Sequence, residues 1–206
     1  MDDRDDRNEK RVDQLKMSEE DIPIKQLILL QVLLTIIAAG LTAYFYSPDW
    51  IELMLKPGGT AFNIAAGLLG AAVLILPAWL YSIFRSEELR KAVKPLLPVV
   101  RNPLGLLLLI SFLAGLGEEL LFRAFLQQML GLWPAAVLFM LAHAGFWAVP
   151  PRTEARLLFA PFSLAAGVVM GLLFREAGLL AAINAHFLYD LAAFYMLKRN
   201  YTGYGG

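Results

Sequence analysis

The residues of this sequence best suited to chemistry are ionisable side chains inside apolar stretches. Glu118 and Glu119 are adjacent in an apolar stretch over residues 104–132, and Arg123 follows four positions after the second glutamate. An ionisable side chain costs several kcal/mol in hydrocarbon, so it normally faces the interior of a helix bundle and pairs with another polar group. We therefore interpret this cluster as the centre of a functional site.

Three further polar residues lie in later apolar stretches: Asp190 and the two histidines of the chain, His143 and His186. Residues four positions apart share a face of a helix, so His186 can contact Asp190, and Phe139 lies one turn before His143. Each polar group alone fits a purely structural role. Six of them on three stretches, in a chain with few buried charges, indicate one shared polar cavity.

Helix geometry predicts different roles for the two glutamates. Successive helix residues point about 100° apart, so Glu118 and Glu119 face different directions. Arg123 is better placed to neutralise Glu119, which predicts a structural ion pair. Glu118 is left as the free carboxylate, and a desolvated carboxylate beside a like charge suits a general base near neutral pH.

The remaining residues limit the chemistry available. Cysteine is absent, which excludes a thiol nucleophile and cysteine-ligated metal, and Ser111 and Ser163 have no informative spacing to either histidine. The sequence contains no HExxH zinc motif, although His143, His186 and a carboxylate from separate helices remain a possible zinc site. Water activation by Glu118 and His143, with oxyanion stabilisation from the His186 helix, needs no cofactor.

Composition places these residues in a membrane protein, because 58% of the chain is hydrophobic and mean hydropathy is +0.58. The predicted fold is all-α: a polytopic transmembrane helix bundle of about six spans. The third apolar segment is too long for one straight span, so it bends, tilts or begins as an interfacial helix after Pro103. The apolar segments cover residues 26–46, 61–84, 103–131, 134–149, 157–174 and 177–197.

Charge distribution predicts the orientation and the domain limits. With a cytoplasmic N-terminus, every lysine and arginine other than Lys56, Arg175 and the buried Arg123 lies inside, so both termini are predicted to be cytoplasmic. Residues 1–24 are expected to form a polar cytoplasmic tail, residues 25–199 the transmembrane domain and residues 200–206 a short C-terminal tail. The small size and short loops favour a prokaryotic cytoplasmic membrane.

Small residues recur at spacings that allow close helix packing, as at Gly67 with Ala71 and Gly167 with Gly171. Packing within the chain is the favoured interpretation, and a homodimer remains possible. The bilayer is an expected partner, and the sequence gives no sign of nucleic-acid binding.

The order of the motifs resembles the CAAX protease and bacteriocin-processing family of intramembrane proteases, which includes the type II CAAX prenyl endopeptidases. Glu118-Glu119-x-x-x-Arg123, Phe139-x-x-x-His143 and His186-x-x-x-Asp190 follow one another on successive apolar segments. The resemblance covers about residues 60–197.

The resemblance implies an intramembrane endopeptidase that cleaves a membrane-associated or hydrophobic peptide or protein. It implies that Glu118 is the catalytic glutamate, that His143 helps to activate water, and that His186 and Asp190 stabilise the oxyanion. No cofactor is expected, with zinc as the alternative. Eukaryotic members carry asparagine where this chain has Asp190, and an ionised aspartate cannot donate a hydrogen bond. Either Asp190 is protonated, or it holds His186 as a donating imidazolium.

Two other classes of function compete with the protease. A non-catalytic membrane immunity or scaffold protein would keep the polar core for folding, and a transporter would use it as a proton relay. Intact motifs favour the enzyme, and a transporter would more often show internal repeats.

Overall fold

The computed structural model describes residues 24–56, 58–84, 96–146 and 153–201, so the predicted tails lie almost entirely outside it. Every secondary-structure element in these ranges is helical. The elements are α2 (Ile24–Tyr46), α3 (Trp50–Met54), α4 (Gly59–Phe84), α6 (Leu97–Val100), α7 (Leu104–Glu119), the π-helix η2 (Leu120–Gln127), α8 (Gln128–Leu130), α9 (Leu132–Phe146), α10 (Thr153–Ala177) and α11 (Leu179–Tyr201).

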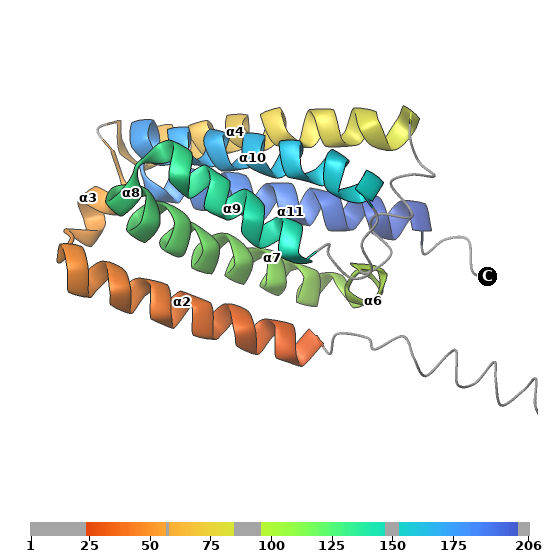
Figure 1. Ribbon diagram of the computed structural model, residues 1–206, viewed down its shortest axis with the longest axis horizontal. Helices are drawn as coiled ribbons and strands as arrows, with labels where there is room; N and C mark the ends of the chain where they lie inside the picture. The colour runs from red at the N-terminus through yellow and green to blue at the C-terminus, as the bar shows by residue number, and fades with distance from the viewer. Residues whose placement is uncertain (1–23, 57, 85–95, 147–152, 202–206) are drawn as a thin grey trace, which may run out of the picture.

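The predicted all-helical membrane bundle is confirmed. The six apolar segments correspond to α2, α4, the continuous helix from α7 to α8, α9, α10 and α11. Within the described ranges, five helical stretches are long and apolar enough to cross a membrane, and the apolar part of α9, Leu132–His143, is shorter. Helix α2 begins and α11 ends at the same end of the bundle (Figure 1), as an even number of crossings requires.

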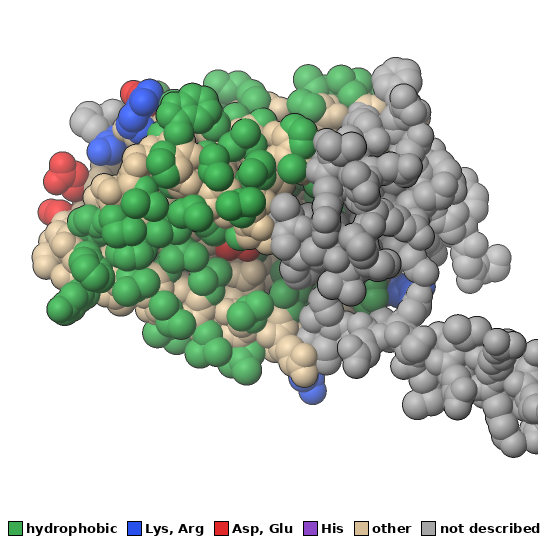
Figure 2. Space-filling view, in the orientation of Figure 1, with side chains coloured by type: hydrophobic (Ala, Val, Ile, Leu, Met, Phe, Trp, Pro, Cys, Tyr) green, Lys and Arg blue, Asp and Glu red, His purple; other side chains and the backbone are tan. Residues whose placement is uncertain are grey.

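The outer surface of the bundle is apolar. Large hydrophobic side chains are exposed along α2, where Leu29 is 58% and Ile36 63% accessible, and green side chains dominate the face in Figure 2. A soluble monomer rarely exposes a contiguous apolar patch of this extent. The surrounding medium that fits such a surface is hydrocarbon, in agreement with the composition.

Small residues bring helices of this one chain together. A Cβ added at Gly67 in α4 would lie 2.9 Å from the carbonyl oxygen of Ala181 in α11, and one at Gly167 in α10 would lie 3.2 Å from Cα of Ala136 in α9. Only glycine allows helices to approach this closely. Packing within the chain is thus confirmed at both positions, and the homodimer stays a prediction.

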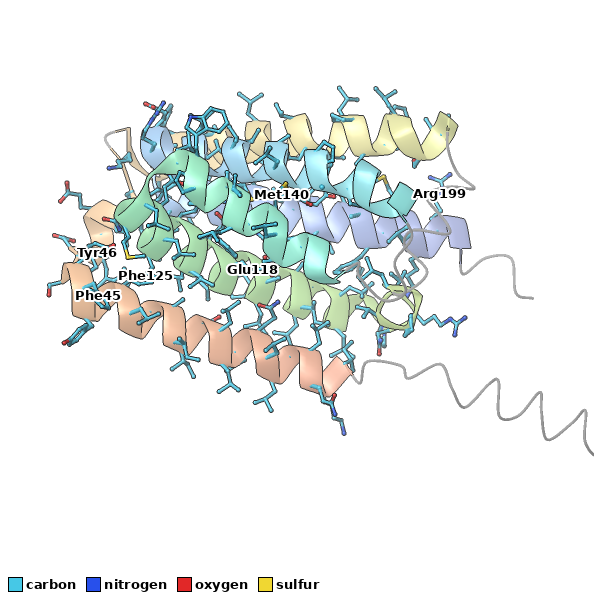
Figure 3. The ribbon with its side chains drawn as sticks, in the orientation of Figure 1. Phe45, Tyr46, Glu118, Phe125, Met140 and Arg199 are labelled. Carbon is cyan, nitrogen blue, oxygen red and sulfur yellow. The ribbon has the colours of Figure 1, made fainter. Side chains whose placement is uncertain are left out.

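The third apolar segment accommodates its length in a way that the sequence did not predict. A helix begins after Pro103, as expected, but from Leu120 to Gln127 it widens into a π-helix. The hydroxyl of Tyr46 in α2 donates to the backbone carbonyl of Phe125 in this stretch over 3.2 Å (Figure 3). Gly131, with a φ of 89° that favours glycine, then turns the chain into α9.

Candidate active site

The two adjacent glutamates lie where α7 passes into the π-helix. Short π-helical stretches are rare and frequently occur at functional sites. Glu119 is fully buried in the bundle, whereas the side chain of Glu118 is 15% exposed. Figure 3 shows Glu118 about midway along the bundle, and at the same place Figure 2 shows acidic atoms in a recess among apolar side chains. The two carboxylates thus occupy different environments, as helix geometry predicts.

Glu119 forms the ion pair that the spacing predicts. Nε of Arg123 donates to Oε2 of Glu119 over 2.8 Å, and both side chains are completely buried. The guanidinium carbon of Arg123 lies 5.0 Å from the centroid of the Phe139 ring, where a cation–π contact adds to the pairing. An arginine in the core of the bundle is therefore held by one carboxylate and one aromatic face.

The other oxygen of Glu119 has a partner that the sequence analysis did not identify. Nδ1 of His186 lies 2.8 Å from Oε1 of Glu119, joining α11 to α7. Since an ionised carboxylate only accepts hydrogen bonds, Nδ1 carries the proton in this contact. Nε2 of His186 then points away from Glu119, 3.9 Å from Oε2 of Glu118 and 3.6 Å from Oδ2 of Asp190.

His143 approaches Glu118 from α9 in the same manner. Its Nδ1 lies 2.9 Å from the backbone carbonyl oxygen of Phe139, and its ring packs on the Phe139 ring with centroids 4.1 Å apart. A carbonyl oxygen can only accept a hydrogen bond, so Nδ1 of His143 is the donor in this contact. Nε2 of the ring is then not used in it. Nε2 lies 3.4 Å from Oε2 of Glu118. Both histidines thus present Nε2 to the same carboxylate oxygen.

The structure therefore brings together all six polar residues singled out in the sequence. At their centre, Oε2 of Glu118 is buried and has no hydrogen-bond partner in the part of the chain that is described. A buried acceptor without a partner normally binds water or a ligand. Polar groups from α7, α9 and α11 thus converge on this oxygen.

Three groups of this cluster are the candidate ligands for a metal ion. Nε2 of His143, Nε2 of His186 and Oε2 of Glu118 are chemically suitable zinc ligands, and each Nδ1–H is bonded to an outer oxygen, as in many metal sites. Within the described ranges, however, no three His, Cys, Asp or Glu residues have the arrangement of a metal site. These three residues are the first ligands to test.

The cluster has a seventh polar member, which contacts Glu118 and was not identified from the sequence. Nε2 of Gln31 in α2 donates to Oε1 of Glu118 over 3.2 Å. The feature of the sequence that could have pointed to Gln31 is its polar amide side chain, which lies between Leu30 and Val32 in the first apolar segment. It belonged to no motif, and its partner lies 87 positions away.

The fold and the site define a helical membrane protein with an acid–histidine cluster inside its bundle. Residues 100–192 match the family model described as type II CAAX prenyl endopeptidase Rce1-like. This range is narrower than residues 60–197 but contains all three motifs, so the resemblance inferred from them is confirmed. The match supports an intramembrane endopeptidase of the CAAX type in general. No curated protein and no solved structure matches the chain significantly.

Proposed function

We propose that this protein is an intramembrane endopeptidase that hydrolyses a peptide bond in a membrane-associated or hydrophobic peptide or protein, with Glu118 as the general base. The observation that carries the proposal is the buried Oε2 of Glu118, which lacks a partner among the described residues and faces Nε2 of two histidines. A water molecule bound there is close to a base and inside a desolvated site.

In the proposed reaction, water donates its hydrogens to Oε2 of Glu118 and Nε2 of His143. Glu118 takes one proton as the water oxygen bonds to the carbonyl carbon of the substrate. The C–N bond then breaks, and the proton passes from Glu118 to the leaving nitrogen, so that the base is regenerated. Water is consumed, and the two products are a carboxylic acid and an amine.

His186 is the proposed donor to the oxyanion. Glu119 accepts from Nδ1 of this ring and fixes its orientation, and Asp190 lies on the Nε2 side. Between two acids, a doubly protonated His186 donates from Nε2 to the negative oxygen of the tetrahedral intermediate. Glu119 and Arg123 then act by holding this ring in place.

The proposed function is tested by comparing membrane peptidomes from cells that contain the intact chain or its Glu118→Ala variant. We expect a defined set of hydrophobic peptides to appear with the intact chain and to be lost with Glu118→Ala. Glu176→Ala is the matched control, because Glu176 is an exposed carboxylate at the end of α10 that pairs with its neighbour Arg175. Identical peptidomes for the intact chain and Glu118→Ala would favour a non-catalytic membrane protein.

A further inference from the structure

Helix α2 lies outside the residues matched by the family model, yet it contacts the proposed base directly. Gln31 is 9% exposed and donates from Nε2 to Oε1 of Glu118 over 3.2 Å. Two other buried or half-buried polar residues of α2 are satisfied within their own helix, since Thr35 donates to the carbonyl of Gln31 and Thr42 to that of Ala38. The Gln31 amide instead reaches across to α7.

A glycine next to Glu118 makes this contact possible. A Cβ added at Gly117 would lie 2.7 Å from Oγ1 of Thr35 and 3.2 Å from the backbone oxygen of Gln31. A larger residue at this position would therefore push α2 and α7 apart. The missing side chain allows the amide of Gln31 to come within hydrogen-bond distance of the neighbouring carboxylate.

Because of this contact, the two carboxylate oxygens of Glu118 differ in their hydrogen bonding. Oε1 accepts from Gln31, whereas Oε2 is without a partner in the described residues and faces His143 and His186. A carboxylate without the first contact can rotate about its terminal torsion, which is broad in glutamate. The amide restricts that rotation and keeps one oxygen directed at the histidines.

We propose that Gln31 is a positioning residue of the active site, which holds the Glu118 carboxylate in the orientation needed for proton transfer. Helix α2 is then a functional part of the enzyme as well as a membrane span. This inference rests on the proposed function, because it assigns a role only if Glu118 is the base. A loose catalytic group lowers the rate of the chemical step, while it leaves substrate binding largely unchanged.

The test replaces Gln31 by methionine, which keeps the chain length and removes the donor. Purified variants are reconstituted in liposomes with the peptide substrate found in the peptidome comparison. We expect Gln31→Met to lower kcat about tenfold with KM within about twofold. The matched control is Thr42→Val, which removes a fully buried hydroxyl from the same helix away from Glu118. It should retain the kcat of the intact chain.

A second variant covers the case in which Gln31→Met does not fold. Gln31→Leu also lacks the donor and is close to glutamine in size, so kcat should fall as in Gln31→Met. A kcat equal to that of Thr42→Val in the folded variants would overturn the positioning role. If Glu118→Gln is also fully active, the proposed function fails and the role of Gln31 falls with it. If only Glu118→Gln is inactive, the failure concerns Gln31 alone.

Discussion

Nδ1 of His186 lies 2.8 Å from Oε1 of Glu119, and this contact links the helix of the proposed oxyanion donor to the helix of the proposed base. The other oxygen of Glu119 accepts from Arg123 over 2.8 Å. The buried carboxylate of Glu119 thus accepts hydrogen bonds from Nε of a guanidinium and from Nδ1 of an imidazole. Glu119 is then the structural centre of the site, while Oε2 of its neighbour Glu118 faces Nε2 of both histidines.

The first prediction concerns the stability that Glu119 provides. Replacing it with glutamine leaves Arg123 without its ion-pair partner in the core, so the free energy of unfolding should fall by about 3 to 5 kcal/mol. Thermal unfolding in detergent, followed by intrinsic tryptophan fluorescence, measures the loss.

The control for this measurement is Glu176→Gln. Glu176 pairs with Arg175, but their side chains are 66% and 60% exposed, so the loss there should be below about 1 kcal/mol. Equal stability of the Glu119→Gln and Glu176→Gln proteins would contradict the structural role of Glu119.

The second prediction concerns the close approach of α2 to α7. Gly117→Ala places a Cβ 3.2 Å from the backbone oxygen of Gln31, so it should separate the helices and reduce both the midpoint temperature and the rate of cleavage. Gly105→Ala is the control on the same helix, because nothing lies within 4 Å of its added Cβ. That variant should be at least as stable as the intact chain, since alanine favours a helix over glycine by about 1 kcal/mol. Similar behaviour of the two variants would argue against a tight interface at Gly117.

The third prediction is that the reaction uses no metal. Activity should survive exhaustive chelation, and elemental analysis should find less than about one zinc per chain. Zinc that is lost together with activity, and that restores activity when added back, would instead make His143, His186 and Glu118 its ligands.

The fourth prediction concerns orientation in the membrane. In this cysteine-free chain, single cysteines at the exposed positions Glu52 and Glu176 should react with an impermeant maleimide on intact cells. Gln26 lies in the first turn of α2 and Arg199 in the last turn of α11, and these two helix ends lie at the end of the bundle opposite α3 (Figure 1). Cysteines at these two positions should react only after the cells are opened. The reverse pattern would place both termini outside.

Local spacing explains which parts of this structure could be predicted from the sequence. Apolar segments long enough to cross a bilayer gave the helices, and the four-residue spacing of Glu119 and Arg123 gave the ion pair, because both are properties of a single helix. The contact of His186 with Glu119 spans 67 positions and that of Gln31 with Glu118 spans 87. Such contacts depend on how the helices pack, which no local pattern specifies.

The π-helix was missed for a related reason. Its eight residues include the buried polar side chains Arg123 and Gln127 among six apolar ones, and this composition does not specify a wider helical turn. Contacts with other helices accompany it, such as the donation from Tyr46 to Phe125 and that from Gln127 to the carbonyl of Gly171 in α10. These partners are distant in sequence, so no local pattern identifies them.

The most direct test of the account is the activity of purified Glu118→Gln protein. The substitution keeps the shape of the side chain and one oxygen that can accept from Gln31, but it removes the proton acceptor, so the midpoint temperature should stay close to that of the intact chain. Release of peptides from reconstituted membrane proteins, measured by mass spectrometry, should fall at least about a hundredfold. Unchanged peptide release by folded Glu118→Gln protein would contradict the assignment of Glu118 as the general base.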